Sequence, residues 1–375
     1  KPAINVLPVG KDSDKATAEV LEGLIRNIEV QSCADVAYDT AIETAVSGGW
    51  GFIRVKLDYT HDDAFDLDIC IDAVPNPLSV YGDFTSTKSD SSDWNQCLVE
   101  DWIDKDEFKK KYPKADVVDW DNDFKAYADW VTDTQVMVAE YWERDEEECT
   151  IYLLSTGQVV DDDYMEQHGE ELALYGIQVI QERPSKKFDV TQYIITAGEV
   201  LERNEWAGQY IPVIPVYGDE INEDGKRHLY SLINAAKDAQ QSYNYWRTSA
   251  VEKVALDTKA PWIGPVGSFN SDPNWSTANT VNHPYLEFDG GIPPFRPGPA
   301  GVPAADIQMA LQAADDMKAI IGIYDASLGA KSNETSGKAI MARQRESDTG
   351  TFHFIDNMNR AIRHVGKIVV DLIPR

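Results

Sequence analysis

The sequence predicts an α+β protein in which an acidic, strand-rich part is followed by a nearly neutral, helical part. Residues 1–220 carry 47 acidic and 18 basic side chains, a net charge of −29, whereas residues 221–375 carry 17 and 16, a net charge of −1. The hydrophobic pattern changes at the same boundary, from mostly alternating residues to a repeat of three and four. A chain of 375 residues with 43% hydrophobic content can bury the cores of two or three domains.

The first part combines a helical pattern with many strand patterns. Apolar and alanine residues from Val20 to Ala45 predict a helix within residues 11–47, ended by Gly48-Gly49. Strands are expected at residues 50–59, 66–74, 78–81, 97–103, 134–144, 149–155, 176–182, 187–196 and 200–203, and a short helix at 104–111. The segments 134–144 and 149–155 are predicted to pair as a hairpin across the acidic turn Asp145–Glu148. Ile211–Val216 contains two prolines, which restrict it to a sheet edge or an extended segment.

The second part predicts a stalk that carries a head. A helical segment at about 226–256 leads into residues 257–303, which hold nine of the 18 prolines and therefore cannot form long regular elements. A second helical segment follows at 304–324, then a loop at 325–336 and a last helix that continues to the end of the chain. The chain does not begin with Met, and its apolar pattern runs up to Arg375, so it is expected to be a piece of a longer protein.

The sequence gives little support for a metal site or an enzyme active site. The four cysteines form no CxxC pair and are interpreted as reduced thiols of an intracellular protein, and the six histidines show no HExxH or Ser/His/Asp spacing. Asp119-Trp-Asp121-Asn-Asp123 begins like a calcium loop, but Phe124 and Trp130 replace the glycine and glutamate that such a loop needs. No run of 18 apolar residues predicts a membrane span. We therefore expect no catalytic residue, metal or cofactor, and no membrane partner.

Basic side chains gather in one region, the last helix. Residues 336–375 contain seven basic and four acidic side chains. The simplest interpretation is a solvated or ion-paired helix face. Lys331 and Lys338, which flank the loop before this helix, are the better candidates for contact with phosphate, whereas the acidic first part lacks the basic patch that tight phosphate binding requires.

Three segments resemble the portal (head-to-tail connector) proteins of tailed bacteriophages, in particular the short-tailed, podovirus-like type. Ile211-Pro-Val-Ile-Pro-Val-Tyr-Gly218 resembles that family's entry into its stem. Lys237-Asp238-Ala-Gln240, with Asn244, Ser249 and Glu252 and then Lys259-Ala-Pro261-Trp262, is similar to its first stem helix and the start of its clip. Ser332-Asn333-Glu334-Thr335-Ser336-Gly337-Lys338, continuing to Arg343, is similar to its loop-to-helix segment. The likeness covers residues 211–375 well and residues 1–210 loosely.

The resemblance implies a portal-type fold. Residues 1–220 would form an acidic, mixed and mostly antiparallel wing domain, 221–256 the first stem helix, 257–303 a small Pro-rich clip, and 304–325 the second stem helix. Residues 326–375 would form the tunnel loop and a long C-terminal wing helix. Lys331, Asn333, Glu334 and Lys338 are then the candidates for facing the DNA channel. The candidates for docking partners at the clip are its aromatic residues Trp262, Phe269, Trp275, Tyr285 and Phe295.

The implied function is structural. Such a protein would form a closed ring, usually a dodecamer, at one capsid vertex of the virion, through which double-stranded DNA is packaged and ejected without sequence specificity. Its partners would be the terminase, the tail adaptor, and the capsid and scaffolding proteins, with assembly in the host cytoplasm. The near-neutral stalk fits this role because firm phosphate contacts would stop DNA from sliding. The apolar stripes of the two stalk helices are larger than the packing of these helices against each other requires. The remaining apolar faces fit contacts between neighbouring subunits of a ring.

Two alternatives remain open on the residues alone. An acidic hydrolase could use a pair among the 64 acidic side chains, although no motif selects a pair. A calcium-binding structural module could use Asp119–Asp123 or Asp161–Asp163. The first alternative predicts a cleft in the first part and turnover that disappears when one carboxylate is removed, and the second predicts that calcium changes the melting temperature.

Overall fold

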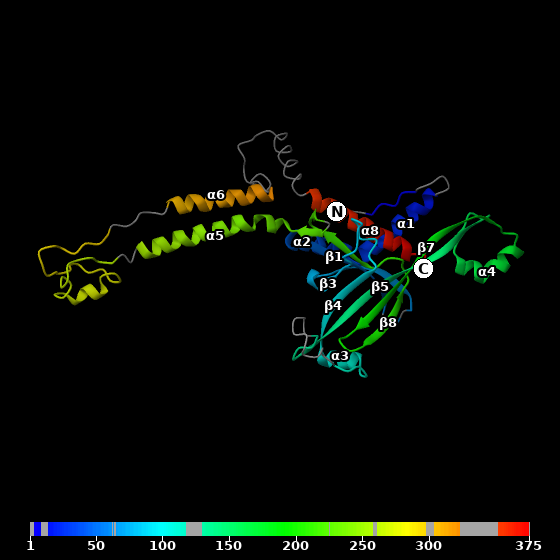
Figure 1. The fold of residues 1–375 in the computed structure, drawn as a ribbon, viewed down its shortest axis with the longest axis horizontal. Coiled ribbons are helices and arrows are strands. Elements are labelled where there is room, and N and C mark those ends of the chain that lie inside the picture. The colour runs from blue at the N-terminus through cyan, green and yellow to red at the C-terminus, as the bar shows by residue number, and fades with distance from the viewer. Residues whose placement is uncertain are drawn as a thin grey trace, which may run out of the picture. The chain divides into compact units, whose positions relative to one another are not determined.

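A computed structural model describes residues 4–8, 14–61, 63, 65–117, 130–224, 226–257, 261–297, 304–322 and 352–374. The protein has mixed α and β structure with antiparallel sheets, as the sequence predicts (Figure 1). The chain divides into two compact units. One comprises Lys1–Ser231 with His353–Arg375, and the other comprises Leu232–Phe352. The C-terminal helix thus belongs to the same unit as the strands, although more than a hundred residues separate them in the sequence.

Two antiparallel sheets organise the first unit. A three-stranded sheet has the order β2-β1-β9, built from β1 (Trp50–Tyr59), β2 (Leu67–Ala73) and β9 (Val213–Tyr217). The larger sheet has the order β3-β4-β5-β7-β8, built from β3 (Val80–Tyr81), β4 (Gln96–Asp104), β5 (Gln135–Leu154), β7 (Val179–Ile195) and β8 (Val200–Trp206), and the short β6 (Val159–Val160) pairs with β5. The proline-containing β9 lies at a sheet edge, as its two prolines predict.

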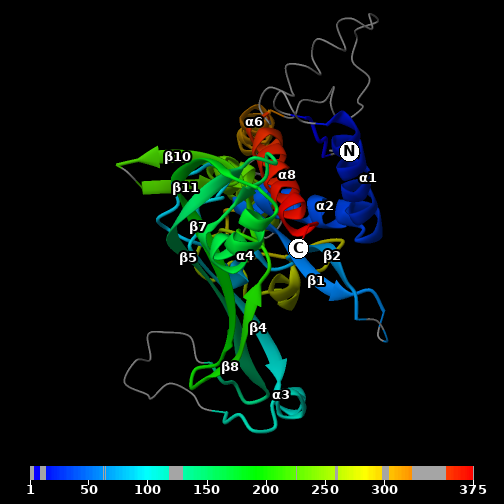
Figure 2. The same cartoon turned by 90° about the vertical axis from the view of Figure 1, so that its right-hand side faces the viewer.

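The main core of the first unit lies between the three-stranded sheet and helices α1 (Lys15–Gln31), α2 (Ala34–Gly48) and α8 (Phe352–Leu372). Ile53, Val55 and Ile214 of the sheet are fully buried, and Val365 and Val369 of α8 pack in the same cluster. Figure 2 shows α8 beside α1 and α2. The amphipathic last helix therefore buries its apolar side within the strand-rich unit.

The first helical pattern forms two helices instead of one. The side chain of Asp14 accepts hydrogen bonds from the backbone N–H groups of Ala16 and Thr17 and so begins α1. The chain then breaks at Cys33, whose φ of 49° is left-handed, and α2 follows directly. The break lets α1 and α2 run in different directions, although their apolar residues fit one continuous helical repeat in the sequence.

The predicted hairpin at residues 134–155 is wrong. Strand β5 runs without interruption from Gln135 to Leu154, and its partner is β7 instead of its own second half. The four acidic residues Asp145–Glu148 include no Gly, Pro or Asn to form a tight turn. They remain extended, and Lys187 and Lys186 of β7 lie opposite Glu147 and Glu148, which offsets part of the acidic charge.

The predicted start of the stalk helix is also wrong. Residues 219–230 form the hairpin of β10 (Asp219–Glu223) and β11 (Lys226–Tyr230), and α5 begins at Leu232. Asp224 has a φ of 51° in the turn. An Asp-Gly dipeptide at 224–225 is a strong signal for such a two-residue turn, so the sequence contained the information. Two further helices are α3 (Lys105–Lys111), which was expected, and α4 (Asp162–Leu174), which was not.

The second unit contains two paired helices and an irregular head. Helix α5 (Leu232–Asp257) packs against α6 (Ala304–Ile321), and the buried side chains at their contact include Ala236 and Ala250 on α5 and Ala310 and Ala313 on α6. These small residues let the two helix backbones approach closely. Between the helices, the short 3-10 helix η3 (Pro273–Thr277) is the one helix described in the proline-rich segment 261–297.

Candidate functional site

The head of the second unit is held together by three aromatic rings. The ring of Trp275 meets those of Trp262 and Phe269 edge-on, with centroid separations of 5.2 and 5.0 Å. Backbone hydrogen bonds of 2.9 Å in both directions join Ile263 to Phe295 and close the base of the head. Edge-to-face pairs of this kind are favourable beyond their buried area. A segment that lacks long regular elements thus gains a small core of its own.

A buried carboxylate fixes the turn that carries Trp275. Asp272 accepts hydrogen bonds from the backbone N–H groups of Asn274 and Glu287, at 2.9 and 3.1 Å. These backbone bonds lower the pKa of Asp272 from its ordinary value because they stabilise the ionised form. The indole N–H of Trp275 donates in turn to the carbonyl oxygen of Glu287 at 2.6 Å. Residues 272–287 therefore form a closed, internally bonded loop.

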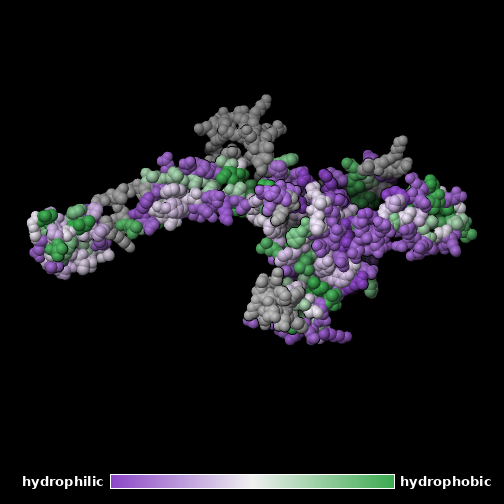
Figure 3. All heavy atoms as spheres, in the orientation of Figure 1, coloured by the Kyte–Doolittle hydropathy of each residue, from purple (hydrophilic) through white to green (hydrophobic). Residues whose placement is uncertain are grey.

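The five aromatic residues predicted to dock partners divide into two groups. Trp262, Phe269 and Trp275 are half-buried in the internal cluster, whereas Tyr285 and Phe295 are exposed. The head also exposes apolar side chains that the sequence did not single out, namely Ile263, Val266, Val281, Phe288 and Ile292. Figure 3 shows hydrophobic side chains gathered on this head, at the left end of the view. The exposed apolar surface is the arrangement expected of a contact site.

The two paired helices share an ion pair near the head, in which the carboxylate is buried and the lysine is exposed. Lys253 on α5 donates to both carboxylate oxygens of Asp306 on α6, at 2.7 and 3.0 Å, and Asp306 is only 4% exposed. A buried carboxylate needs such a partner because desolvation otherwise disfavours its charge. The pair therefore fixes the register of α6 against α5.

The outer faces of the helix pair expose several apolar side chains among polar ones and carry little net charge. Exposed apolar side chains on α5 and α6 are Ile233, Tyr245, Val251, Val254, Leu256, Ile307, Met309, Leu311 and Ile320. The two helices together contain six acidic and four basic residues, a net charge of −2. The helix pair thus offers apolar surface to other molecules and has no excess of positive charge to hold phosphate.

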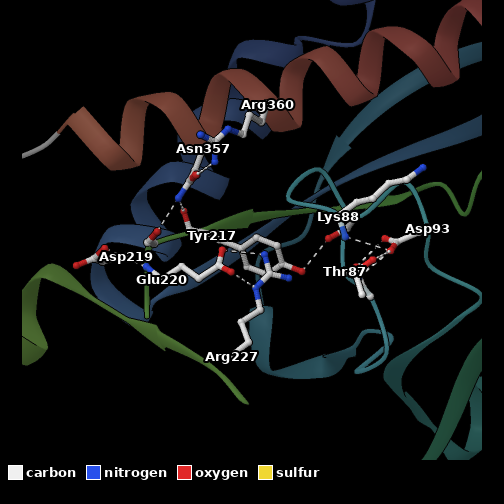
Figure 4. A network of polar contacts seen from close by, with 12 residues as sticks. Thr87, Lys88, Asp93, Tyr217, Asp219, Glu220, Arg227, Asn357 and Arg360 are labelled. Carbon is white, nitrogen blue, oxygen red and sulfur yellow. Dashed lines mark hydrogen bonds and ion pairs between the residues drawn. The ribbon is translucent and has the colours of Figure 1, made fainter. Parts of the chain in front are cut away.

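In the first unit, a polar network joins α8 to the end of β9 and to the β10–β11 hairpin. Asn357 of α8 donates to the carbonyl oxygens of Tyr217 and Gly218, at 3.2 and 2.7 Å. The Tyr217 hydroxyl bonds to the Ser91 hydroxyl at 2.9 Å, and the Arg227 guanidinium lies 4.0 Å from the Tyr217 ring centroid (Figure 4). Arg227 also pairs with Glu220 at 2.8 Å across the β10–β11 hairpin. The network makes the hairpin and the C-terminal helix parts of one rigid arrangement.

The predicted channel residues Lys331, Asn333, Glu334 and Lys338 lie outside the described residues, as does the acidic segment Asp119–Asp123. The other candidate calcium segment has structural partners. Asp161 caps α4 through the N–H of Tyr164, Asp162 accepts the N–H of Thr150 at 2.7 Å, and Asp163 pairs with Lys187 at 2.7 Å. The three carboxylates have separate partners and do not converge.

The described residues contain no group of three or more His, Cys, Asp or Glu side chains placed to hold a metal ion. A shallow depression in the first unit is lined by Gln209, Tyr210, Lys367, Val370, Asp371 and Pro374. Its one carboxylate, Asp371, accepts the backbone N–H of Gln209 at 2.7 Å. This depression therefore does not supply the carboxylate pair that a hydrolase needs. Within the described parts of the chain, no helix is long and apolar enough to cross a membrane.

The main features of the described structure are a helix pair that carries an aromatic head and a strand-rich unit that contains the C-terminal helix. The family model of phage P22-like portal proteins matches residues 1–375, and the chain belongs to that family. A portal protein from Acyrthosiphon pisum secondary endosymbiont phage 1 is 25% identical over 392 residues, which cover 96% of this chain and 53% of that protein. The chain thus spans about half the length of this relative.

Proposed function

We propose that this chain is the stem, clip and wing portion of a portal subunit, which forms a ring at one capsid vertex of the virion and conducts double-stranded DNA. The observation that carries the proposal is the second unit, where two paired helices with a net charge of −2 bear a head with exposed aromatic residues. Family membership over residues 1–375 supports the same reading. In this role the protein needs no active site, metal or cofactor of its own.

The stem consists of α5 (Leu232–Asp257) and α6 (Ala304–Ile321), because residues 219–230, where the sequence predicts the start of the stem helix, form the β10–β11 hairpin of the first unit. A conduit must let DNA slide, and each firm phosphate contact adds affinity that opposes sliding. The weak net charge of the helix pair suits this requirement. Its exposed apolar side chains are available for the stems of neighbouring subunits, whose head-to-tail contacts close a ring, about a dozen subunits in size.

The clip consists of residues 257–303 and docks the terminase during packaging and the tail adaptor afterwards. Tyr285 and Phe295 are its contact residues because they are exposed, at 70% and 58%. Trp262, Phe269 and Trp275 act indirectly, since their mutual packing gives the head its shape. Both partners would therefore meet a preformed surface, which lowers the entropic cost of docking.

The wing consists of residues 1–220 together with the C-terminal helix, and it faces the capsid and scaffolding proteins during assembly in the host cytoplasm. Residues 325–336 would form the tunnel loop between the stem and this helix. Lys331, Asn333, Glu334 and Lys338 remain the candidates for contact with passing DNA. Asn357 would then hold the wing end of that connection, because it bonds the carbonyl oxygens of Tyr217 and Gly218.

The ring is tested on the full-length protein by native mass spectrometry and negative-stain microscopy. We expect closed rings of about twelve subunits. A protein that stays monomeric at all accessible concentrations would refute the proposal. The clip assignment is tested separately with Tyr285→Ser/Phe295→Ser, which should form rings but bind the terminase and tail adaptor at least tenfold more weakly. Loss of rings in this variant would instead place these residues between subunits.

A further inference from the structure

Strands β5 and β7 extend beyond the sheet to which they belong. The pairing of β4 with β5 ends at Glu143, and the pairing of β8 with β7 ends at Val190. Beyond these points, residues 145–189 form a two-stranded ribbon with the short β6 added at one edge and α4 at its end. We call residues 145–189 the arm (Figure 1). The structure describes every residue of the arm.

The arm has very little core. Leu154 and Val160 are its buried apolar side chains, and α4 contains no buried residue at all. A two-stranded ribbon without a covered face is marginally stable in water. A projection with so small a core contributes little to the stability of the first unit, so a role in contact with another molecule accounts for it better.

Apolar side chains are exposed at the outer end of the arm. They are Val159 (57% exposed) of β6, Leu174 (85%) and Tyr175 (79%) at the end of α4, and Val179 (41%) and Ile180 (65%) of β7. We call these five residues the arm-end patch. The segments that bear them are joined by pairing, since Val159 and Gln181 both lie opposite Leu153, and Ser155 donates to the carbonyl oxygen of Gln178. Figure 3 shows the hydrophobic side chains at this end among hydrophilic neighbours.

The surroundings of the patch are strongly acidic. The arm contains twelve acidic and three basic side chains, a net charge of −9. Two of its three basic residues are occupied within the arm, because Lys186 pairs with Glu146 and Lys187 with Asp163. Glu166, Glu170 and Glu171 are exposed on α4 beside the patch. An apolar centre with an acidic rim is the anatomy of an interface for a positively charged partner.

We propose that the arm-end patch docks a Lys- and Arg-rich amphipathic segment of a different protein. Apolar side chains of that segment would cover Leu174 and Tyr175, and its basic side chains would meet the carboxylates of α4. This surface is separate from the clip, and the proposal does not depend on the passage of DNA through the stem.

Charge selects this occupant over the two nearest alternatives. A second copy of this chain brings a net charge of −30, and two of the three basic residues of its C-terminal helix, Arg360 and Lys367, already pair with Asp356 and Asp90. Like charges across an interface oppose association. Nucleic acid is repelled for the same reason, since its phosphates need cations. A basic amphipathic segment is attracted by the rim and also covers the apolar centre.

A defined probe tests the apolar centre. The probe is a fluorescent 18-residue peptide of leucine and lysine at helical spacing, titrated with the full chain in 150 mM salt. Leu174→Ser/Tyr175→Ser should weaken its binding at least tenfold, whereas the control Val20→Ser/Val30→Ser should weaken it less than twofold. The control residues on α1 are similarly exposed, at 62% and 70%. Equal weakening by both variants, or by neither, would overturn the proposal.

The acidic rim is tested in the same assay. Glu170→Gln/Glu171→Gln should weaken binding of the peptide at least fivefold more than the control Glu107→Gln/Glu205→Gln does. The control removes the same charge from exposed positions outside the arm. Equal effects would mean attraction to the net charge of the whole chain and would overturn a specific site. A photo-crosslinker at position 175 in assembling particles should join a Lys/Arg-rich segment of another protein. Crosslinking to a second copy of this chain, or no product, would also overturn the proposal.

Discussion

His364 makes the first unit sensitive to mild acid. Its side chain is 2% exposed in the core face of α8, its Nδ1 has no hydrogen-bond partner among the described residues, and the Tyr210 ring meets it edge-on at 5.3 Å. The pKa of His364 is lowered from 6.5 to about 4, chiefly by burial and to a smaller extent by Lys367, Lys88 and Arg144, while Asp90 acts in the opposite direction. The folded protein therefore holds this imidazole neutral at pH values where the unfolded chain protonates it.

The difference between the pKa of 6.5 in the unfolded chain and about 4 in the folded protein sets the direction and the size of the change in stability. Between pH 6.5 and pH 4 the unfolded chain binds a proton that the folded protein excludes, so stability falls as the pH falls. Each pH unit well inside this window removes about 1.4 kcal/mol. From pH 7 to pH 5, His364 alone should therefore reduce the free energy of unfolding by about 2 kcal/mol.

The assay is urea unfolding followed by tryptophan fluorescence at pH 7, 6 and 5, for the protein and for His364→Leu. Leucine has a similar volume and does not titrate, so the stability of the protein relative to the variant should decline by about 2 kcal/mol between pH 7 and pH 5. Parallel pH curves for the protein and His364→Leu would refute this reasoning.

Three further predictions concern packing and polar contacts. Gly51→Ala should destabilise the first unit by more than about 2 kcal/mol, because the new Cβ would lie 2.1 Å from a carbonyl oxygen of α2. By contrast, Gly23→Ala should stabilise the unit by about 0.5–1 kcal/mol, because a Cβ at this helical position would have no atom within 4 Å. Urea unfolding measures both, and a neutral Gly51→Ala would contradict the packing. Asn357→Ala removes two bonds to carbonyl oxygens and should cost about 1–3 kcal/mol in the same assay; an unchanged midpoint would argue against the network. Ala310→Leu should separate α5 from α6 and lower the melting temperature by several degrees in calorimetry, whereas Leu311→Ala, at an exposed position, should not lower it comparably.

Local chemistry made many elements predictable. The strand at Trp50–Tyr59 has the expected bounds because apolar and polar residues alternate from Ile53 to Tyr59. The edge position of β9 follows from its prolines, and α3 begins and ends within a residue of the prediction. The aromatic residues of the head were recognisable as a group, but their division was not. The inward packing of Trp275 depends on the hydrogen bond from its indole to the carbonyl oxygen of Glu287, twelve residues away. The sequence alone does not distinguish Trp275 from the exposed Tyr285.

The failures share one physical cause. Asp145–Glu148 looked like a turn because four acids in a row are polar, yet they lie within a continuous strand whose partner begins 25 residues after β5 ends. The hairpin before α5 was missed, despite its Asp-Gly turn signal, because apolar residues at 229, 232 and 233 fit a helical repeat as well as a strand. Short apolar patterns do not distinguish these cases, so strand pairing decides them. Helix α4, with no buried residue, gave no periodic signal to detect.

The sequence by itself determined the α+β class, the separation of an acidic part from a neutral one, and the resemblance to portal proteins, because each depends on composition or on the order of short segments. Only the tertiary structure decided that α8 completes the core beneath β1 and β9, that three aromatic rings brace the head while two are exposed, and that β5 and β7 extend into an arm. These features depend on contacts between residues far apart in the chain, and no local pattern specifies which distant partner a side chain will meet.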